Sequence, residues 1–252
     1  MTDPLFDMAG RAVLAAGAAG GIGAGLAEAL AERGARVMVA DQDAAAARGV
    51  AGGLPGEGHG SCPLDVRDEA SCEAAVKAAL GLTGRLDLLL NSVGIFRTAP
   101  ALELPAEDFA ETLATNVTGA FLLSRQAARV MADRGGGRMI HLASVSSQVV
   151  NPEYAAYASG KAALSHLIRV LALEWAPLGV TVNAIGPAVI ATPLVEEFLK
   201  KTGKYDYQMS RIPLGRFATV EDLVGTVLLL ASPAGAFITG QTIYVDGGRT
   251  LV

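Results

Sequence analysis

The chain has 252 residues, a formal net charge of −5 and 51% hydrophobic residues, which is typical of a globular protein with a full core and not of a disordered one. An acidic surface repels phosphate backbones, so nucleic acid is not expected as a partner. Two cysteines are too few for a disulfide framework, three scattered histidines suggest no metal site, and no apolar run reaches the ~18 residues of a membrane helix. We therefore expect a cytoplasmic protein that binds neither metal nor membrane.

Short apolar runs with the character of buried strands alternate with helix-like segments along the whole chain. The expected strands are 11–16, 35–40, 59–64, 86–90, 137–143, 180–185 and 242–245, and the expected helices are 21–33, 68–80, 107–132, 154–175 and 220–230. This alternation predicts an α/β fold: a Rossmann-like, doubly wound parallel sheet of about seven strands with helices on both faces. No linker interrupts the pattern, so 1–252 is expected to form a single dinucleotide-binding and catalytic domain.

One long segment, 186–219, shows no strand pattern and carries several prolines and glycines. A segment of that length inside a compact domain usually covers a functional site. We therefore expect residues of about 188–216 to form a substrate lid.

A glycine-rich turn follows the first expected strand and opens the first expected helix. It contains Gly17, Gly21, Ile22 and Gly23. Glycines let a pyrophosphate approach the backbone, and the helix N-terminus offers free N–H groups and the positive end of its dipole. Glycines also serve ordinary turns, but the order strand, turn, helix, strand favours a dinucleotide site.

Asp41 ends the second expected strand, 24 residues after Gly17. A carboxylate at this position accepts hydrogen bonds from the adenosine ribose hydroxyls and repels a 2′-phosphate. No Lys or Arg lies between Gly17 and Gly23, and Gln42 follows Asp41. These features predict NAD rather than NADP as the cofactor; the alternative for Asp41 is a solvated loop acid.

Tyr157 and Lys161 are four residues apart on an expected helix and therefore share one face. A nearby ammonium lowers the pKa of a phenol, which would let Tyr157 act as general acid or base. Ser144 follows an expected strand, thirteen residues before Tyr157. Ligands bind beyond the carboxyl ends of parallel strands, where a hydroxyl can hold the substrate oxygen.

In combination, these motifs resemble the short-chain dehydrogenase/reductase family over essentially the whole chain. The resemblance implies that Ser144, Tyr157 and Lys161 are catalytic, that Asn116 supports a water-linked proton path to Lys161, and that Tyr157 and Lys161 also contact the cofactor. The further cofactor contacts that it implies are Asp65 and Val66 near the adenine, Asn91 and Gly94 in the motif after the fourth strand, and Pro187, Ile190 and Thr192 near the nicotinamide.

Three departures from the family pattern stand out. Ala16 occupies a position where the family usually has Thr, Ser92 and Val93 replace Asn and Ala, and Ala188 replaces Gly after Pro187. The first two motifs pack near each other in the family, so we expect that they changed together. The departures bear on cofactor affinity more than on proton transfer, whose residues are all present.

The helix that carries Tyr157 is apolar over most of its circumference, whereas a surface helix needs only one apolar stripe. A second subunit is the natural cover, and the resemblance implies the same. We therefore expect a homo-oligomer, either a dimer or a tetramer.

The function expected from these features is NAD(H)-dependent hydride transfer between nicotinamide and a secondary alcohol or ketone, with Tyr157 as general acid or base. The substrate stays open between a sugar or polyol, a hydroxy acid and a plain alcohol. An alternative is a 3-oxoacyl thioester (acyl-carrier-protein) reductase, against which Asp41 argues, because that reaction usually uses NADPH. A second alternative is a non-catalytic NAD(H)-binding regulator, against which the intact Tyr157 and Lys161 argue.

Overall fold

The computed structural model describes residues 4–252, without the side chains of residues 193, 194, 196 and 198, so that residues 1–3 of the expected domain lie outside the description. Within this range the strands form one seven-stranded sheet in the order β3-β2-β1-β4-β5-β6-β7, and every neighbouring pair is parallel. The strands are β1 (Ala12–Ala16), β2 (Arg36–Asp41), β3 (Gly60–Pro63), β4 (Leu88–Asn91), β5 (Gly137–Leu142), β6 (Val180–Pro187) and β7 (Thr242–Val245). The fold predicted from the alternating pattern is confirmed.

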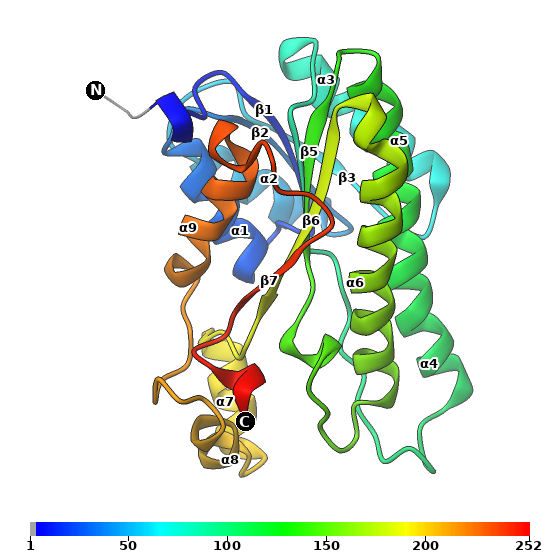
Figure 1. Cartoon of the computed structure of the whole chain (residues 1–252), viewed down its shortest axis with the longest axis vertical. Helices are drawn as coiled ribbons and strands as arrows, with labels where there is room; N and C mark the ends of the chain where they lie inside the picture. The colour runs from blue at the N-terminus through cyan, green and yellow to red at the C-terminus, as the bar shows by residue number, and fades with distance from the viewer. Residues whose placement is uncertain (1–3) are drawn as a thin grey trace.

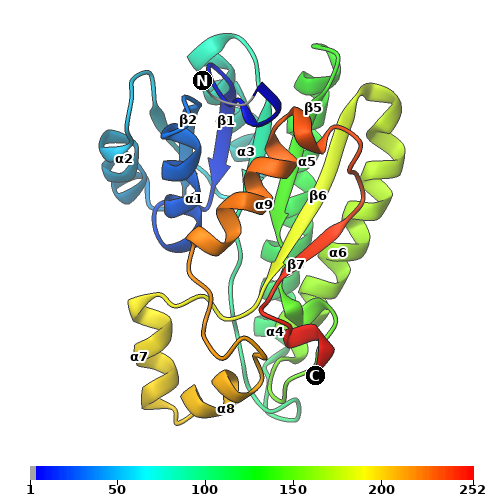
Figure 2. The ribbon, with the colours of Figure 1, turned by 60° about the vertical axis from the view of Figure 1, so that its left-hand side comes forward.

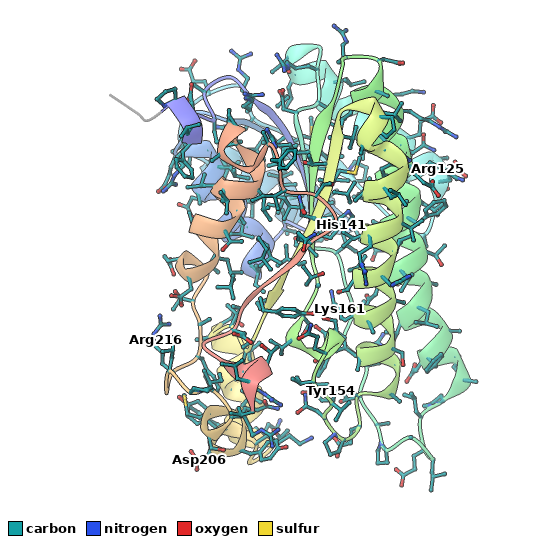
Figure 3. The ribbon with its side chains drawn as sticks, in the orientation of Figure 1. Arg125, His141, Tyr154, Lys161, Asp206 and Arg216 are labelled. Carbon is teal, nitrogen blue, oxygen red and sulfur yellow. The ribbon has the colours of Figure 1, made fainter. Side chains whose placement is uncertain are left out.

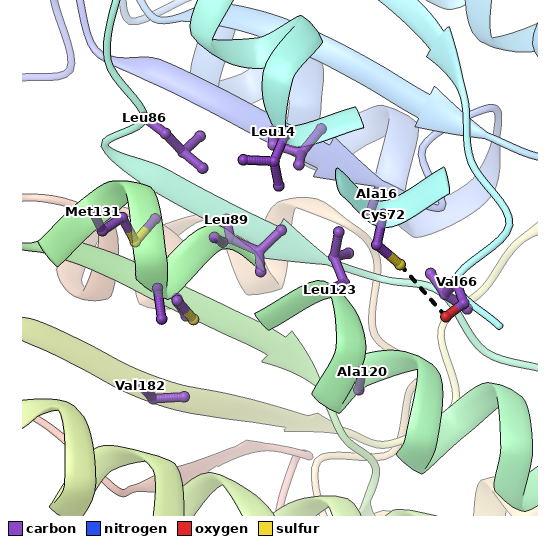
Figure 4. Packing of buried hydrophobic residues seen from close by; sticks show 14 of the residues in the cluster. Leu14, Ala16, Val66, Cys72, Leu86, Leu89, Ala120, Leu123, Met131 and Val182 are labelled. Atoms are coloured by element: carbon purple, nitrogen blue, oxygen red, sulfur yellow. Dashed lines mark hydrogen bonds between the residues drawn. The ribbon is translucent and has the colours of Figure 1, made fainter. Parts of the chain in front are cut away.

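Helices cover both faces of this sheet (Figure 1). They are α1 (Gly21–Ala31), α2 (Ala44–Gly53), α3 (Glu69–Thr83), α4 (Ala106–Leu113), α5 (Ala120–Ala132), α6 (Ala155–Trp175), α7 (Pro193–Lys201), α8 (Tyr205–Ser210) and α9 (Glu221–Ala231). Alternate residues of β1 explain why the strand is apolar throughout: Leu14 and Ala16 pack in the cluster that includes α3, α5 and α6, whereas Val13 and Ala15 pack in the cluster that includes α1 and α9. Figure 4 shows part of the first cluster.

The strand order reverses between β1 and β4, because the chain runs outward from β1 to β3 and then returns to the other side of β1. In doubly wound sheets, ligands bind in the crevice beyond the carboxyl ends of the strands at this point. Figure 2 shows α7 and α8 beyond those ends, at the same end of the molecule as the C-terminus. The fold therefore places the expected lid over the expected binding crevice.

Three elements differ from the expectation. Helix α2 was not expected, because its sequence is rich in alanine and glycine and lacks a clear apolar stripe; its N-terminus is capped by Asp43, whose carboxylate accepts from the N–H groups of Ala45 and Ala46. The helix expected at 107–132 is divided into α4 and α5 by a π-helical turn, Ala114–Gly119. The lid, expected only as a segment without strands, contains α7 and α8.

Backbone pairing closes the lid at its base. Ile190 and Ala218 form an isolated parallel bridge, with hydrogen bonds of 2.7 Å from Ala191 N to Ala218 O and 3.0 Å from Ala218 N to Val189 O. Above this bridge the lid has its own small apolar cluster, in which Leu199 and Phe217 are buried. The lid is thus a folded unit anchored at both ends, which positions its side chains over the crevice.

Candidate active site

The glycine turn lies between β1 and α1, at the point where the strand order reverses. Gly17 has a φ of +71°, and Gly20, the N-cap of α1, provides no side-chain cap. A Cβ at Gly20 or Gly21 would meet no atom within 4 Å. No side chain caps the first-turn N–H groups of α1, and the space beside Gly20 and Gly21 is open, which suits an anionic pyrophosphate.

Ser92 explains one departure from the family pattern. Its Oγ lies 2.8 Å from Ala16 O and 2.9 Å from Gly17 O, so it ties the end of β4 to the glycine turn. A Cβ at Gly23 would overlap both this hydroxyl and the Gly17 carbonyl oxygen. The Ser92 hydroxyl therefore requires a residue without a side chain at position 23. Serine, which is smaller than the Asn usual in the family pattern, keeps this contact with the turn.

Asp41 stands at the carboxyl end of β2 and is partly exposed. One carboxylate oxygen accepts from Ala19 N at 3.1 Å, and the other accepts from Asp43 N at 3.1 Å. The first contact joins Asp41 directly to the glycine turn, so its negative charge is held beside the dinucleotide crevice. A ribose that reached this crevice would meet an acceptor, and a 2′-phosphate would meet a like charge.

Asp65 and Val66, the expected adenine contacts, follow the carboxyl end of β3, next to β2 in the sheet. Arg67 pairs with Asp65 at 2.9 Å and holds the pKa of that carboxyl down at about 2, mainly through its side-chain hydrogen bond. Val66 packs against the π-helical turn so closely that a Cβ at Gly119 would overlap its side chain. Of the two, Asp65 is partly exposed but both of its carboxylate oxygens accept from Arg67, whereas Val66 is buried and joins β3 to the π turn.

Asn91, at the end of β4, is fixed by a buried hydrogen-bond chain that the sequence did not reveal. Its Oδ1 accepts from Val93 N, and its Nδ2 lies 3.2 Å from Nδ1 of His141, whose Nε2 lies 3.2 Å from the Ser124 hydroxyl. Because Nδ2 can only donate, His141 accepts at Nδ1 and donates from Nε2 to Ser124, which in turn donates to Ala120 O. Burial lowers the pKa of His141 to about 4, so the ring stays neutral and keeps these roles.

Lys161 is 5% exposed, and its ammonium donates to the Leu142 carbonyl at 2.6 Å. Gly94 and Asn116 lie beside it: a Cβ at Gly94 would be 3.5 Å from Nζ and 3.3 Å from Asn116 Oδ1. The Asn116 side chain is fully engaged with the backbone of Ile95, accepting from its N–H and donating to its carbonyl. Asn116 thus fixes the loop next to Lys161, from within the π turn, a helix form frequent at functional sites.

Tyr157 lies on the first turn of α6 and packs edge-on against Phe96 and Tyr154, with ring centroids 4.8 Å and 6.1 Å away. The Nζ of Lys161 is 5.7 Å from the centroid of the Tyr157 ring, and Figure 3 shows Lys161 and Tyr154 at the same end of α6. Burial raises the pKa of Tyr157, and a hydrogen bond with Ser144 lowers it in part. The expectation that Lys161 lowers this pKa is therefore not met; the hydrogen bond with Ser144 acts in that direction instead.

The remaining expected cofactor residues lie where β6 leads into the lid. Pro187 ends β6 opposite Val245, Ile190 is buried in the bridge to Ala218, and the Thr192 hydroxyl accepts from Val195 N at 3.3 Å. They line the start of the lid, on the same edge of the sheet as Ser144. The fold thus brings together the glycine turn, the expected proton-transfer residues and the lid base.

Two features of the site had no signal in the sequence. The acceptor for Lys161 is a backbone carbonyl, which any residue at 142 would offer. Arg249 Nη2 lies 3.4 Å from Asn151 Oδ1 although the two residues are 98 positions apart, and a sequence pattern cannot show that proximity.

Among residues 4–252, leaving aside residues 193, 194, 196 and 198 whose side chains are not described, no group of three or more His, Cys, Asp and Glu side chains could hold a metal ion. None of the helices in that range has the length and apolar character required to cross a membrane.

The depressed pKa of Lys161 predicts how stability depends on pH. Burial lowers this pKa to about 8, compared with about 10.4 in an unfolded chain. Between these values the unfolded chain binds more protons than the folded protein, so stability rises with pH. Relative to Lys161→Met, the wild-type free energy of unfolding is expected to increase by about 3 kcal/mol between pH 7.5 and 10.5.

Urea unfolding of both proteins at several pH values measures this difference. Lys77→Met is the matched control, because it also removes one lysine but at an exposed position paired with Glu73 on α3. If the difference in the free energy of unfolding between wild type and Lys161→Met stays constant across this pH range, the pKa of Lys161 is not lowered by burial and the prediction is wrong.

Comparison with known proteins places this geometry among dehydrogenases. The family model described as enoyl-(acyl carrier protein) reductase matches residues 17–250. A D-threitol dehydrogenase from Mycolicibacterium smegmatis is 38% identical over 248 residues, covering 98% of this chain and 95% of that protein. An NAD-dependent glycerol dehydrogenase from Listeria innocua is 33% identical over 252 residues, covering 99% and 97%. Among solved structures, a gluconate 5-dehydrogenase from Burkholderia cenocepacia in complex with NADP and tartrate aligns with a TM-score of 0.92 at 33% identity, covering 99% of this chain and 98% of the other.

Proposed function

The chain belongs to the short-chain dehydrogenase/reductase family, and on that premise we propose that it oxidises a secondary hydroxyl of a polyol, sugar or hydroxy acid to the ketone, and catalyses the reverse reduction, with NAD(H) as cofactor. One observation carries the proposal: Ser144, Tyr157 and Lys161 converge at the carboxyl end of the sheet, beside an uncapped glycine turn. The relatives named as threitol, glycerol and gluconate dehydrogenases support this choice of substrate chemistry.

In this mechanism Tyr157 takes the proton of the substrate hydroxyl during oxidation and returns it during reduction. Ser144, whose side chain lowers the pKa of Tyr157 in part, would hold the substrate oxygen as charge develops on it. Lys161, fixed by Leu142 O, would bind the nicotinamide ribose and supply positive charge behind the Tyr157 ring. When bound, the nicotinamide accepts or donates the hydride, and the chain supplies orientation and proton transfer.

We propose that Gly17, Gly21, Ile22 and Gly23 hold the pyrophosphate, and that Asp41 selects NAD over NADP. The contact from Ala19 N to Asp41 supports this, because it holds a negative charge where a 2′-phosphate would lie. The relatives divide on the point, since one is named NAD-dependent and another was solved with NADP. The remaining cofactor contacts are proposed as Asp65, Val66, Asn91, Gly94, Pro187, Ile190 and Thr192.

We also propose that the protein is a homo-oligomer, a dimer or tetramer, acting in the cytoplasm. Apolar side chains on and just after α6 support association: Val170, Leu173 and Leu178 are 41%, 78% and 43% exposed. A second subunit would remove this surface from water. Light scattering at micromolar concentration tests this; a monomer mass would overturn it.

The function is tested with purified protein, NAD or NADP, and a panel of polyols, sugar acids, hydroxy acids and simple secondary alcohols, following reduced nicotinamide by absorbance. We expect turnover of polyhydroxy compounds with a KM for NAD at least about tenfold below that for NADP, because a like charge opposes the 2′-phosphate. Comparable KM values for the two cofactors would contradict the role of Asp41.

A second function, reduction of a 3-oxoacyl thioester, has support only at the level of substrate class, because the matching family model is described as an enoyl-(acyl carrier protein) reductase, which also acts on acyl thioesters but in a different reaction. The same assay decides it by including an acetoacetyl thioester with NADPH and NADH. Efficient NADPH-dependent reduction of the thioester, without turnover of polyhydroxy compounds, would replace the proposal. Binding of NADH without turnover of any panel member would favour a regulator.

A further inference from the structure

The hydroxyl of Tyr244, on β7, lies 2.8 Å from the Oγ of Ser147, at the end of the short turn η3 (Val145–Ser147) that follows Ser144. The Ser147 hydroxyl itself donates to the Ser144 carbonyl at 2.7 Å. Because a serine hydroxyl has a single proton, Ser147 must accept from Tyr244, and the phenol is the donor. Two hydrogen bonds therefore run in one direction, from β7 through η3 to the backbone of Ser144.

A glycine on the neighbouring strand makes room for the Tyr244 ring. Gly186, on β6, is the partner of Tyr244 in the register of the sheet. A Cβ at Gly186 would lie 2.5 Å from Cδ1 and 2.6 Å from Cε1 of the Tyr244 ring, and 3.5 Å from the backbone carbonyl carbon of Ser144. The ring therefore stands where a side chain of residue 186 would otherwise be, close to the backbone of Ser144, and its hydroxyl reaches η3.

The backbone of Ser144 is held at several points while its hydroxyl proton stays available. The Ser144 carbonyl accepts from both the N–H and the Oγ of Ser147, at 3.0 Å and 2.7 Å. The Ser144 Oγ accepts from Ser146 N at 3.1 Å, and this contact uses a lone pair of the hydroxyl and not its proton. The turn thus fixes the place of the buried Ser144 side chain and leaves its proton to donate to a reacting oxygen.

We propose that Tyr244 is a positioning residue, which acts through Ser147 to hold the backbone of Ser144 so that the Ser144 hydroxyl meets the substrate oxygen. This role requires no contact of the Tyr244 phenol with substrate or cofactor. A donor that is fixed in place before the reaction stabilises developing charge without having to reorient, so loss of its support is expected to affect the transition state more than binding. The inference rests on the proposed function for the reaction that Ser144 assists.

Steady-state kinetics of Tyr244→Phe test this role with the panel compound that wild type oxidises fastest, because the variant keeps the ring over Gly186 and removes only the hydroxyl. We expect kcat to fall about three- to tenfold, while the KM for NAD, the Kd for NADH and the melting temperature change little. Ser147→Ala is expected to lower kcat at least as much, and adding Tyr244→Phe to it should lower kcat no further, because both changes break one chain. Ser147→Thr keeps the hydroxyl and is expected to retain most of the rate.

Tyr205→Phe and Ser210→Ala are the matched controls. The first removes a phenolic hydroxyl within the lid, and the second removes a hydroxyl that, like that of Ser147, donates to the carbonyl three residues before it. Both controls should keep kcat within about twofold of wild type.

A Ser144→Ala background separates positioning of Ser144 from a general structural effect. In that background Tyr244→Phe is expected to change kcat by less than about twofold, because the hydroxyl that it positions is gone. An equal loss of kcat with and without the Ser144 hydroxyl would overturn the inference, as would a Tyr244→Phe enzyme with the kcat of wild type, even if the proposed function stands.

Hydrogen exchange measured by mass spectrometry gives a readout that needs no turnover. The amides of Ser146 and Ser147, which donate to Ser144, should exchange faster in Tyr244→Phe and Ser147→Ala than in wild type and the two controls. Faster exchange at η3 without turnover of any panel compound would support the hydrogen-bond chain while the proposed function fails. Exchange equal to that of wild type in both variants would show that the chain does not hold Ser144, and the inference would be wrong.

Discussion

Replacing Tyr157 by Phe is expected to lower kcat for alcohol oxidation by about 10²–10⁴-fold, because the variant keeps the ring and loses the hydroxyl that we propose exchanges the proton. The edge-on contacts with Phe96 and Tyr154 involve the ring and not the hydroxyl, so the packing of α6 should survive. The melting temperature and the affinity for NADH are therefore expected to change little. Steady-state kinetics, thermal unfolding and NADH titration of wild type and variant measure the three quantities.

Tyr205→Phe is the matched control for this change. The ring of Tyr205 packs against Phe217 inside the lid, 5.0 Å between centroids, so the control removes a phenolic hydroxyl outside the catalytic cluster. Its kcat is expected to stay within about twofold of wild type. A Tyr157→Phe enzyme that keeps most of its rate would show that another group transfers the proton.

The pH profile of the same assay addresses the raised pKa of Tyr157. In the protein described here, burial raises that pKa and the hydrogen bond with Ser144 offsets part of the rise. Positive charge near the Tyr157 ring would favour the phenolate. Because Lys161 does not lower this pKa in the structure, positive charge brought by a bound oxidised cofactor is expected to adjust Tyr157 for work near neutral pH.

The sequence could predict those parts of the fold that rest on local pattern. The apolar runs at Ala12–Ala16 and Leu88–Asn91 indicate strands because both of their faces are buried between helices. The glycine turn is visible because an added side chain would clash at Gly17 and Gly23. Helix α2 was missed for the opposite reason: its alanines and glycines bury only Ala47, so no apolar stripe marks it.

The parts of the site that could not be predicted depend on contacts between distant segments. His141 was one of three scattered histidines in the sequence, yet the fold places it between Asn91 and Ser124 and fixes its tautomer. The carbonyl that holds Lys161 belongs to the backbone and carries no side-chain signal. Spacing along the chain identified Tyr157 and Lys161 because one helix carries both.

Replacing Gly17 by Ala is expected to damage both stability and cofactor binding. Gly17 has a φ of +71°, and an added Cβ would lie 2.7 Å from Val93 N and 2.9 Å from Ser92 C, both backbone atoms that cannot move aside. Overpacking costs about 1–3 kcal/mol and a left-handed conformation about 1–2 kcal/mol. We expect the free energy of unfolding to fall by about 3 kcal/mol, with a decrease in melting temperature of roughly 6–12 °C.

The same strain should displace the turn that faces the N-terminus of α1, so the Kd for NADH is expected to rise by about tenfold or more. Gly49→Ala is the matched control, because a Cβ at Gly49 in α2 would meet no atom within 4 Å and alanine favours a helix. Its melting temperature should equal or slightly exceed that of wild type, with unchanged NADH affinity. If Gly17→Ala matches this control in both measurements, the close approach of the glycine turn to the end of β4 does not constrain the site, and the cofactor must bind elsewhere in the crevice. A variant that loses stability but keeps its NADH affinity would separate the two roles and leave Gly17 with a structural one alone.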